Sequence, residues 1–231
     1  MSQYLLDDQT IQDFIINGYL ILKPQLPMAY HQATYAQLSA MIEADDNPGN
    51  ELLTVAPYLH EVLEDPVITG ALESLVGPNN VRNRHCHCHA WGPGNETQGW
   101  HKDYPLGSNM RYHRGRTLLL FYYPQDVTPN MGPTAIQPGS QYYKHSTPNL
   151  PGLNLCAQAG SVVITHYELW HQATANTSKH MRFMLKFLYH RTEEPNAPSW
   201  DCANTEWQPD SHPLFPHRNL WQHMWHWHTG A

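Results

Sequence analysis

Three side chains of types that often bind metal ions are His101, Asp103 and His171. His101 and Asp103 are two residues apart, so an extended segment would place both on one face, where an imidazole and a carboxylate can share one cation. With His171 they supply two imidazoles and one carboxylate, the facial triad that binds Fe(II) and leaves coordination positions open. Structural zinc sites instead close with four ligands, usually including thiolates. The three residues therefore predict a metal site that can accept a bidentate co-substrate and dioxygen.

A lone cation, Arg182, follows in an apolar segment. A charged residue in an apolar strand is costly unless an anionic group meets it, and a guanidinium offers a planar fork to a carboxylate. The run 161–165 predicts a buried strand that ends near His171, and the run 181–188 predicts a second strand returning from a tight turn. We therefore expect the imidazole and the guanidinium on two adjacent strands, in a site for a metal and a carboxylate-bearing small molecule.

Other histidine motifs compete with this site, because the chain has 17 His residues. In the segment His85-Cys-His-Cys-His89, the imidazoles would face one side of a strand and the thiols the other, so they cannot form one tetrahedral site. One face of this strand should line the pocket, and the sequence does not decide which. His166 lies an odd number of residues before His171 and is expected to face the other way. His226 and His228 have no carboxylate at a useful spacing and predict an aromatic clasp or a subunit contact.

The composition favours a globular protein with many turns. The 231 residues are 41% hydrophobic and 14% charged, with 19 Pro and 14 Gly, which is typical of a mostly β architecture. A formal net charge of −7 without any run of Lys or Arg argues against a nucleic-acid partner. The N-terminal residues do not resemble a signal peptide, no window approaches a membrane span, and the four Cys suggest no disulfide framework. A cytoplasmic location is the resulting expectation.

The predicted elements divide the chain into a helical first third and a β-rich remainder. Helices are expected from Asp7 or Asp8 to Asn17-Gly18, over 27–43, and from Asp65-Pro66 to Gly77, with a strand over 19–22. Short strands with Pro and Gly between them are then expected over 81–91, 117–123, 134–137, 161–165 and 181–188. Strands that follow one another without helices predict a sandwich or a barrel. The last residues, 193–231, are rich in Pro and Trp without a clear period and predict an extended cover over the β core.

Several motifs, taken in order, resemble the phytanoyl-CoA dioxygenase-like family of Fe(II)/2-oxoglutarate-dependent oxygenases over nearly the whole chain. They are the entry segment FIINGYLIL at 14–22, the His101-x-Asp103 pair, the segment GPTAIQPGS at 132–140, and Leu169-Trp170-His171 followed by Arg182. The resemblance implies a mainly β fold with flanking helices: a double-stranded β-helix (jelly roll, cupin-like) with N-terminal helices packed on the outside. It also implies a single domain, 1–231, with helical support over 1–80, the β-helix core over 81–191 and a C-terminal cover over 192–231.

The resemblance assigns a role to each matching residue. It implies that the iron ligands are His101, Asp103 and His171, and that Arg182 anchors the C5 carboxylate of 2-oxoglutarate. Gln98 and Thr134 match positions that contact the co-substrate in some members. Relatives that halogenate have a small residue at the position of Asp103, so a carboxylate there favours hydroxylation.

One departure from the family pattern concerns the carboxylate anchor. Many members have a Ser two residues after the distal His, and here that residue is Ala173. Thr134 or Thr174 is expected to replace the missing hydroxyl. Phe121 falls where several relatives have a Trp near the co-substrate, with plain core packing as the alternative.

The expected function is that of an Fe(II)-dependent dioxygenase that consumes 2-oxoglutarate and O2, releases succinate and CO2, and hydroxylates an unactivated C–H bond of a small molecule. A CoA thioester is not favoured, because little basic surface is available for its phosphates. Two alternatives stay open: a cupin-like metal-binding protein without oxygenase activity, and an oxygenase acting on a protein or peptide side chain. The segment 104–116 is the expected rim over the iron, and an open groove there would favour the second alternative. A homodimer through the aromatic C-terminus also stays open.

Overall fold

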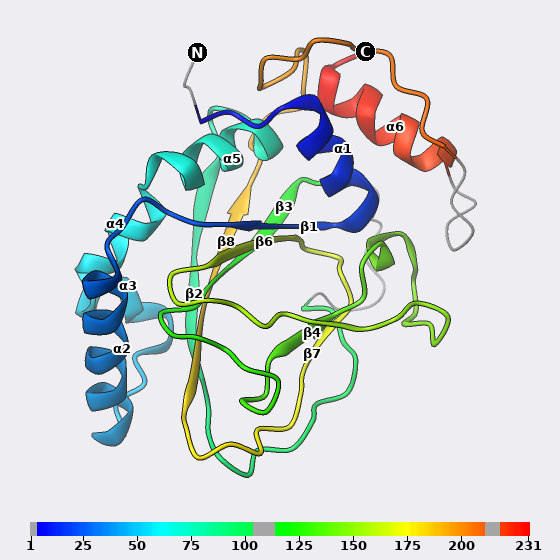
Figure 1. The fold of residues 1–231 in the computed structure, drawn as a ribbon. Coiled ribbons are helices and arrows are strands. Elements are labelled where there is room, and N and C mark those ends of the chain that lie inside the picture. Colours follow the sequence, from blue (N-terminus) through cyan, green and yellow to red (C-terminus); the bar gives the residue numbers. More distant parts are fainter. Residues whose placement is uncertain (1–3, 104–113, 211–217) are drawn as a thin grey trace.

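The computed structural model describes residues 4–103, 114–210 and 218–231. Most of the expected rim, 104–113, therefore lies outside the described residues. The described chain forms three layers: helices, a five-stranded sheet and a three-stranded sheet (Figure 1). The two sheets face each other as in a jelly roll and are not closed into a barrel, which confirms the predicted fold class.

The helices predicted for the first third are present. α1 spans Asp8–Asn17; the Asp7 carboxylate accepts a hydrogen bond from the Thr10 amide at 2.8 Å, and Gly18 ends the helix with φ +78°. The other two predicted helices are α2, Met28–Glu43, and α5, Pro66–Val76, which Asp65 caps. The short helices between α2 and α5 were not predicted; they are η1 (Gly49–Glu51), α3 (Leu52–Val55), η2 (Pro57–Leu59) and α4 (His60–Leu63).

The large sheet is antiparallel, with strand order β1-β6-β3-β8-β2. Its strands are β1 (Tyr19–Leu22), β2 (Val81–Trp91), β3 (Thr117–Tyr122), β6 (Val162–His166) and β8 (Arg182–His190). The expectation that β6 and β8 would be neighbours is wrong, because β3 lies between them: Phe121 is opposite Val163 on one side and Lys186 on the other.

The small sheet has the order β5-β4-β7, with β5 (Leu153–Asn154), β4 (Thr134–Ile136) and β7 (His171–Ala173). The turn η3, Ser140–Tyr142, follows β4. His171 begins β7 in this sheet, whereas Arg182 begins β8 in the large sheet. The two side chains therefore come from different sheets, which corrects the expectation of adjacent strands in one sheet.

The two faces of the large sheet pack against different layers. One face carries Leu118, Leu120 and Tyr122 and forms the larger hydrophobic cluster with the helices. Cys86 and Cys88 belong to that cluster, both at 1% exposure. Because side chains alternate along a strand, the imidazoles of β2 point to the opposite face, toward the small sheet. This settles the question that the sequence left open: the histidine face of β2 lines the space between the sheets.

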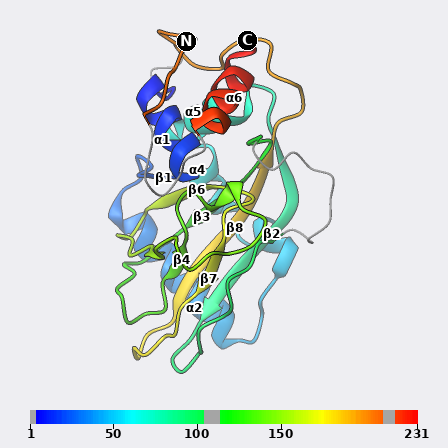
Figure 2. The ribbon, with the colours of Figure 1, turned by 90° about the vertical axis from the view of Figure 1, so that its right-hand side faces the viewer.

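The C-terminal segment departs from the expected extended cover. It ends in the helix α6, Arg218–Thr229, which packs against α1 at one end of the sheets (Figures 1 and 2). Trp221, Trp225 and His228 are buried inside the chain, which supports the aromatic clasp. The homodimer stays a prediction. In the described parts of the chain, the longest apolar helices fall short of what a membrane crossing requires.

Candidate metal centre

A cavity lies between the two sheets and encloses about 420 Å³ of empty space, part of it open to solvent. The cavity is lined by residues of both sheets and of the segment that follows β2. The lining residues discussed below are His89, Gln98, His101, Asp103, Phe121, Thr134, His171, Ala173, Arg182 and Lys186. All six residues that the sequence singled out for the metal and co-substrate therefore line one cavity.

His101 and His171 form a bridged pair through their backbones. The His101 amide donates to the His171 carbonyl at 2.9 Å, and the His171 amide donates back at 3.0 Å. Each ring turns its Nδ1 to a backbone carbonyl, that of Gly99 at 2.9 Å and that of Leu169 at 3.0 Å. A carbonyl only accepts, so each Nδ1 carries a hydrogen, and Nε2 is the ring atom that can bind a metal, as in metal-binding imidazoles.

Asp103 completes a group whose ligand atoms lie within 4.8 Å of one another, the only such group of three or more among the described residues. Its Oδ1 is 3.7 Å from the His171 Nε2, and its Oδ2 accepts a hydrogen bond from the Lys186 Nζ at 3.1 Å. Burial alone would raise the pKa of Asp103, but His171 and Lys186 outweigh it and hold the pKa well below its usual range. The three residues thus offer two imidazole nitrogens and one ionised carboxylate oxygen, which suits a divalent transition metal.

Arg182 lies in the same cavity with only 1% of its surface exposed. Its Nε and Nη2 both donate to the Gly132 carbonyl, at 3.1 and 3.0 Å, and Nη1 has no partner among the described residues. Burial lowers the pKa of the guanidinium, which shows the cost of keeping the charge there. A buried cation with an unpartnered donor is expected to bind an anionic ligand. The residues present therefore fit a carboxylate-bearing co-substrate.

The remaining predicted co-substrate positions also face the cavity. Thr134 is 3% exposed, and its Oγ1 accepts a hydrogen bond from the Tyr123 hydroxyl at 3.2 Å, which leaves its own hydrogen to donate. The Thr174 hydroxyl instead donates to the Pro133 carbonyl at 2.7 Å, so Thr134 is the better substitute for the hydroxyl missing at Ala173. Gln98 lines the cavity, and its Oε1 accepts from the Ala173 amide at 3.3 Å.

Comparison with known proteins decides the family. The model of the phytanoyl-CoA dioxygenase (PhyH) family matches residues 17–184, most of the chain, including the three candidate ligands and Arg182. The chain belongs to this family. No curated protein sequence matches it significantly.

Several solved structures have a similar fold. The non-heme α-ketoglutarate-dependent carbocyclase SnoK from nogalamycin biosynthesis has a TM-score of 0.65 and 20% identity, over 81% of this chain and 85% of SnoK. The epimerase SnoN, in complex with Fe3+, α-ketoglutarate and nogalamycin RO, has a TM-score of 0.64 and 15% identity, over 80% and 85%. HygX from Streptomyces hygroscopicus, with iron bound, has a TM-score of 0.63 and 14% identity, over 84% and 90%. At these identities the likeness concerns the fold.

Two further residues of this PhyH-family chain line the cavity: Lys186, which the sequence did not single out, and His89, whose direction the sequence left open. Lys186 is four residues after Arg182 in the same apolar strand, so the argument that singled out Arg182 applied to it equally. His89 lines the cavity with its Nε2 unpartnered among the described residues. Burial, with smaller effects from Lys186 and other charges, lowers the pKa of His89 to about 3, so its ring is neutral. Only the orientation of β2, which the sequence left open, could have revealed His89.

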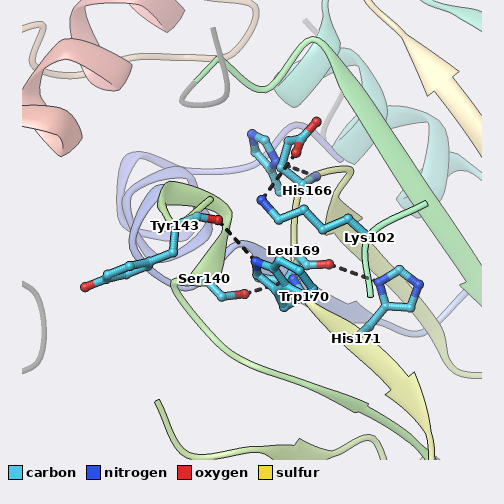
Figure 3. Close-up of polar contacts among 8 residues, drawn as sticks. Lys102, Ser140, Tyr143, His166, Leu169, Trp170 and His171 are labelled. Carbon is cyan, nitrogen blue, oxygen red and sulfur yellow. Dashed lines mark hydrogen bonds and ion pairs between the residues drawn. The ribbon is translucent and has the colours of Figure 1, made fainter. Parts of the chain in front are cut away.

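A buried ion pair links the two segments that carry the candidate metal ligands. The Lys102 Nζ is 3.3 Å from the Glu168 carboxylate, and the two side chains are 4% and 3% exposed. Figure 3 shows the Lys102 amine on the His166 side, away from the His171 ring. The Glu168 amide donates to the His166 Nδ1 at 3.1 Å, and the Trp170 amide donates to the Ser140 Oγ at 2.9 Å. The pair thus ties the residue between His101 and Asp103 to the segment that precedes His171.

Lys102→Met is expected to lower the free energy of unfolding by about 3 kcal/mol, because it leaves Glu168 as a buried carboxylate without its lysine. Chemical denaturation of the metal-free protein measures this change. The exposed Lys144 supplies the matched control, and Lys144→Met should change stability little. Equal stability of the two variants would show that the pair does not hold the site together.

Proposed function

We propose that this chain is an Fe(II)- and 2-oxoglutarate-dependent dioxygenase that hydroxylates an unactivated C–H bond of a small molecule. One observation carries the proposal. The same cavity is lined by two imidazole Nε2 atoms, one ionised carboxylate and a buried guanidinium whose Nη1 has no partner in the described parts of the chain. The three metal ligands alone are compatible with many metal-dependent reactions. A guanidinium beside them favours a co-substrate such as 2-oxoglutarate, which chelates the metal at one end and has a carboxylate at the other.

The three ligand side chains would hold the metal through groups that are already oriented. Backbone carbonyls fix the hydrogen on the Nδ1 of His101 and His171, and Lys186 holds one oxygen of Asp103 so that the other faces His171. A facial set of three ligands leaves room for further ligands. Fe(II) bound there supplies O2 activation coupled to the decarboxylation of 2-oxoglutarate to succinate and CO2.

The co-substrate would be bound by its distal carboxylate at Arg182. The Nη1 donor and the Thr134 hydroxyl are the polar groups that would receive it, and Gln98 borders the same side of the cavity next to Ala173. The apolar neighbour Phe121 packs 6.3 Å from the His171 ring, centroid to centroid, and helps to exclude water from the site. In this proposal residues 1–231 act as a single oxygenase domain.

The choice of hydroxylation rests on Asp103, because a carboxylate at this position leaves no vacancy for a halide. Proteins of similar fold include, by their names, a carbocyclase and an epimerase. The oxidative outcome in this fold therefore varies, and in this proposal it depends on the substrate. A metal-binding protein without oxygenase activity would not need a buried guanidinium whose Nη1 lacks a partner among the described residues.

Purified protein loaded with Fe(II) should convert 2-oxoglutarate to succinate in air, and a library of small molecules should contain compounds that accelerate the conversion. Mass spectrometry of the accelerating compounds should show the addition of one oxygen atom. Reactions with a chelator or without O2 are the controls. If Fe(II)-loaded protein consumed no 2-oxoglutarate under any condition, the metal-binding alternative would replace the proposal. If only peptides accelerated the reaction, the alternative with a protein substrate would.

A further inference from the structure

The cavity contains a second buried cation, Lys186, which 2-oxoglutarate binding at Arg182 does not use. Lys186 follows Arg182 by four residues on β8, so the two side chains lie on the same face of the sheet. Its residue exposure is 9%, and it borders the cavity between His87 on β2 and Phe121 on β3, its opposite neighbours in the sheet. A lysine this deep requires a reason, because burying an ammonium is costly.

The contact with Asp103 satisfies only part of this ammonium. Lys186 Nζ donates to the Asp103 Oδ2 at 3.1 Å, and this is its one hydrogen bond to the described residues. An ammonium has three N–H donors. The other two have no partner in the described parts of the chain, and the Lys186 side chain lines the cavity beside the carboxylate that would bind the metal.

The charges of the loaded site do not cancel. A divalent metal, Arg182 and Lys186 bring four positive charges, whereas Asp103 and the 2-oxoglutarate dianion bring three negative ones. His89 is neutral, and Lys102 and Glu168 compensate each other away from the cavity. Asp103 is the only carboxylate among the described lining residues. One positive charge is left over in the cavity, and a singly charged anion would neutralise it.

We propose that the substrate is a monocarboxylate and that Lys186 binds its carboxylate. This inference rests on the proposed function, because the charge excess exists only with the metal and 2-oxoglutarate in place. A phosphate dianion would leave the site with a negative excess, and a neutral substrate would leave the positive one. Since the Lys186 ammonium contacts a candidate metal ligand, the substrate carbon that reacts lies within a few bonds of its carboxylate.

The test uses protein loaded with Zn(II), which does not activate O2, and with 2-oxoglutarate. Metal analysis and a calorimetric titration with 2-oxoglutarate establish loading first. Failure to bind the metal and the co-substrate would contradict the proposed function, and this inference with it. With loading established, the next titrations concern Lys186 alone.

Loaded protein is titrated by calorimetry with butyrate against butyramide, and with benzoate against benzamide. Each acid should bind at least about ten-fold more tightly than its amide, the size of one charge-assisted hydrogen bond. Lys186→Met should abolish this difference, Lys186→Arg should keep it, and Lys179→Met, at an exposed lysine, should leave it unchanged. If Lys186→Met fails to retain zinc, the comparison of acid with amide in the wild-type protein still tests whether the site prefers a carboxylate.

Three results would overturn the inference: neither acid binds saturably, acid and amide bind equally to wild type, or the preference for the acid survives in Lys186→Met. A variant that loses affinity only for 2-oxoglutarate would also overturn it, because Lys186 would then serve the co-substrate.

Discussion

Asp103→Ala is expected to abolish Fe(II)-dependent succinate formation and to weaken metal binding by more than about 100-fold, since loss of even an outer-shell partner costs 10–100-fold. The substitution removes the only anionic group of the candidate triad and leaves the Lys186 ammonium beside two imidazoles without its carboxylate. A cation facing the metal position then repels the ion that the imidazoles alone bind weakly. Anaerobic calorimetry with Mn(II) measures the metal affinity, and succinate formation measures turnover.

The matched control for this prediction is Asp46→Ala, at an exposed carboxylate after α2. It should keep both metal affinity and turnover. Retention of a single tight Mn(II) site in Asp103→Ala would mean that other residues hold the metal, and the triad would be wrong.

Arg182→Met is expected to weaken 2-oxoglutarate binding by about 100-fold, since a buried charge-assisted contact contributes about 3 kcal/mol. It should not destabilise the ligand-free protein by a comparable amount. Without its ligand Arg182 is a buried cation whose Nη1 lacks a partner among residues 4–103, 114–210 and 218–231, and an apolar side chain of similar length removes that cost. Calorimetric titration with 2-oxoglutarate and denaturation of the ligand-free protein measure the two quantities.

This pair of results separates a binding role from a structural one. A structural arginine would lose stability and affinity together on substitution. Arg82→Met, at an exposed position of β2, is the control and should change neither quantity. Unchanged 2-oxoglutarate affinity in Arg182→Met would show that the anchor lies elsewhere.

Local signals predicted most of the fold. Capping residues such as Asp7 and Asp65 marked the starts of helices, and runs of apolar residues marked the strands of the large sheet other than β2, whose sequence is rich in His and Cys. The order of strands could not be read in the same way. Consecutive antiparallel strands commonly pair, so β6 and β8 were expected side by side, but in this topology β3 separates them. The helix α6 was missed although Leu220, Trp221, Met224 and Trp225 have helical spacing, because its Trp and His residues are weak helix formers.

In the site, too, features within one segment could be predicted from the sequence, whereas contacts between distant segments could not. The spacing of His101 and Asp103 and the isolated charge of Arg182 were visible because each is unusual within its own segment. Lys186 carried the same signal, and its meaning became clear only when the fold placed its Nζ at Asp103. The buried Lys102–Glu168 pair joins residues 66 positions apart, and no pattern within either segment indicates the contact.

The structure of the protein crystallised without O2 in the presence of Mn(II) and 2-oxoglutarate tests the central claim most directly. Anomalous scattering should place one Mn(II) between the Nε2 atoms of His101 and His171 and an oxygen of Asp103. The distal carboxylate of 2-oxoglutarate should meet the Arg182 Nη1. A metal held by any other set of side chains, or a 2-oxoglutarate carboxylate that does not contact Arg182, would contradict the account.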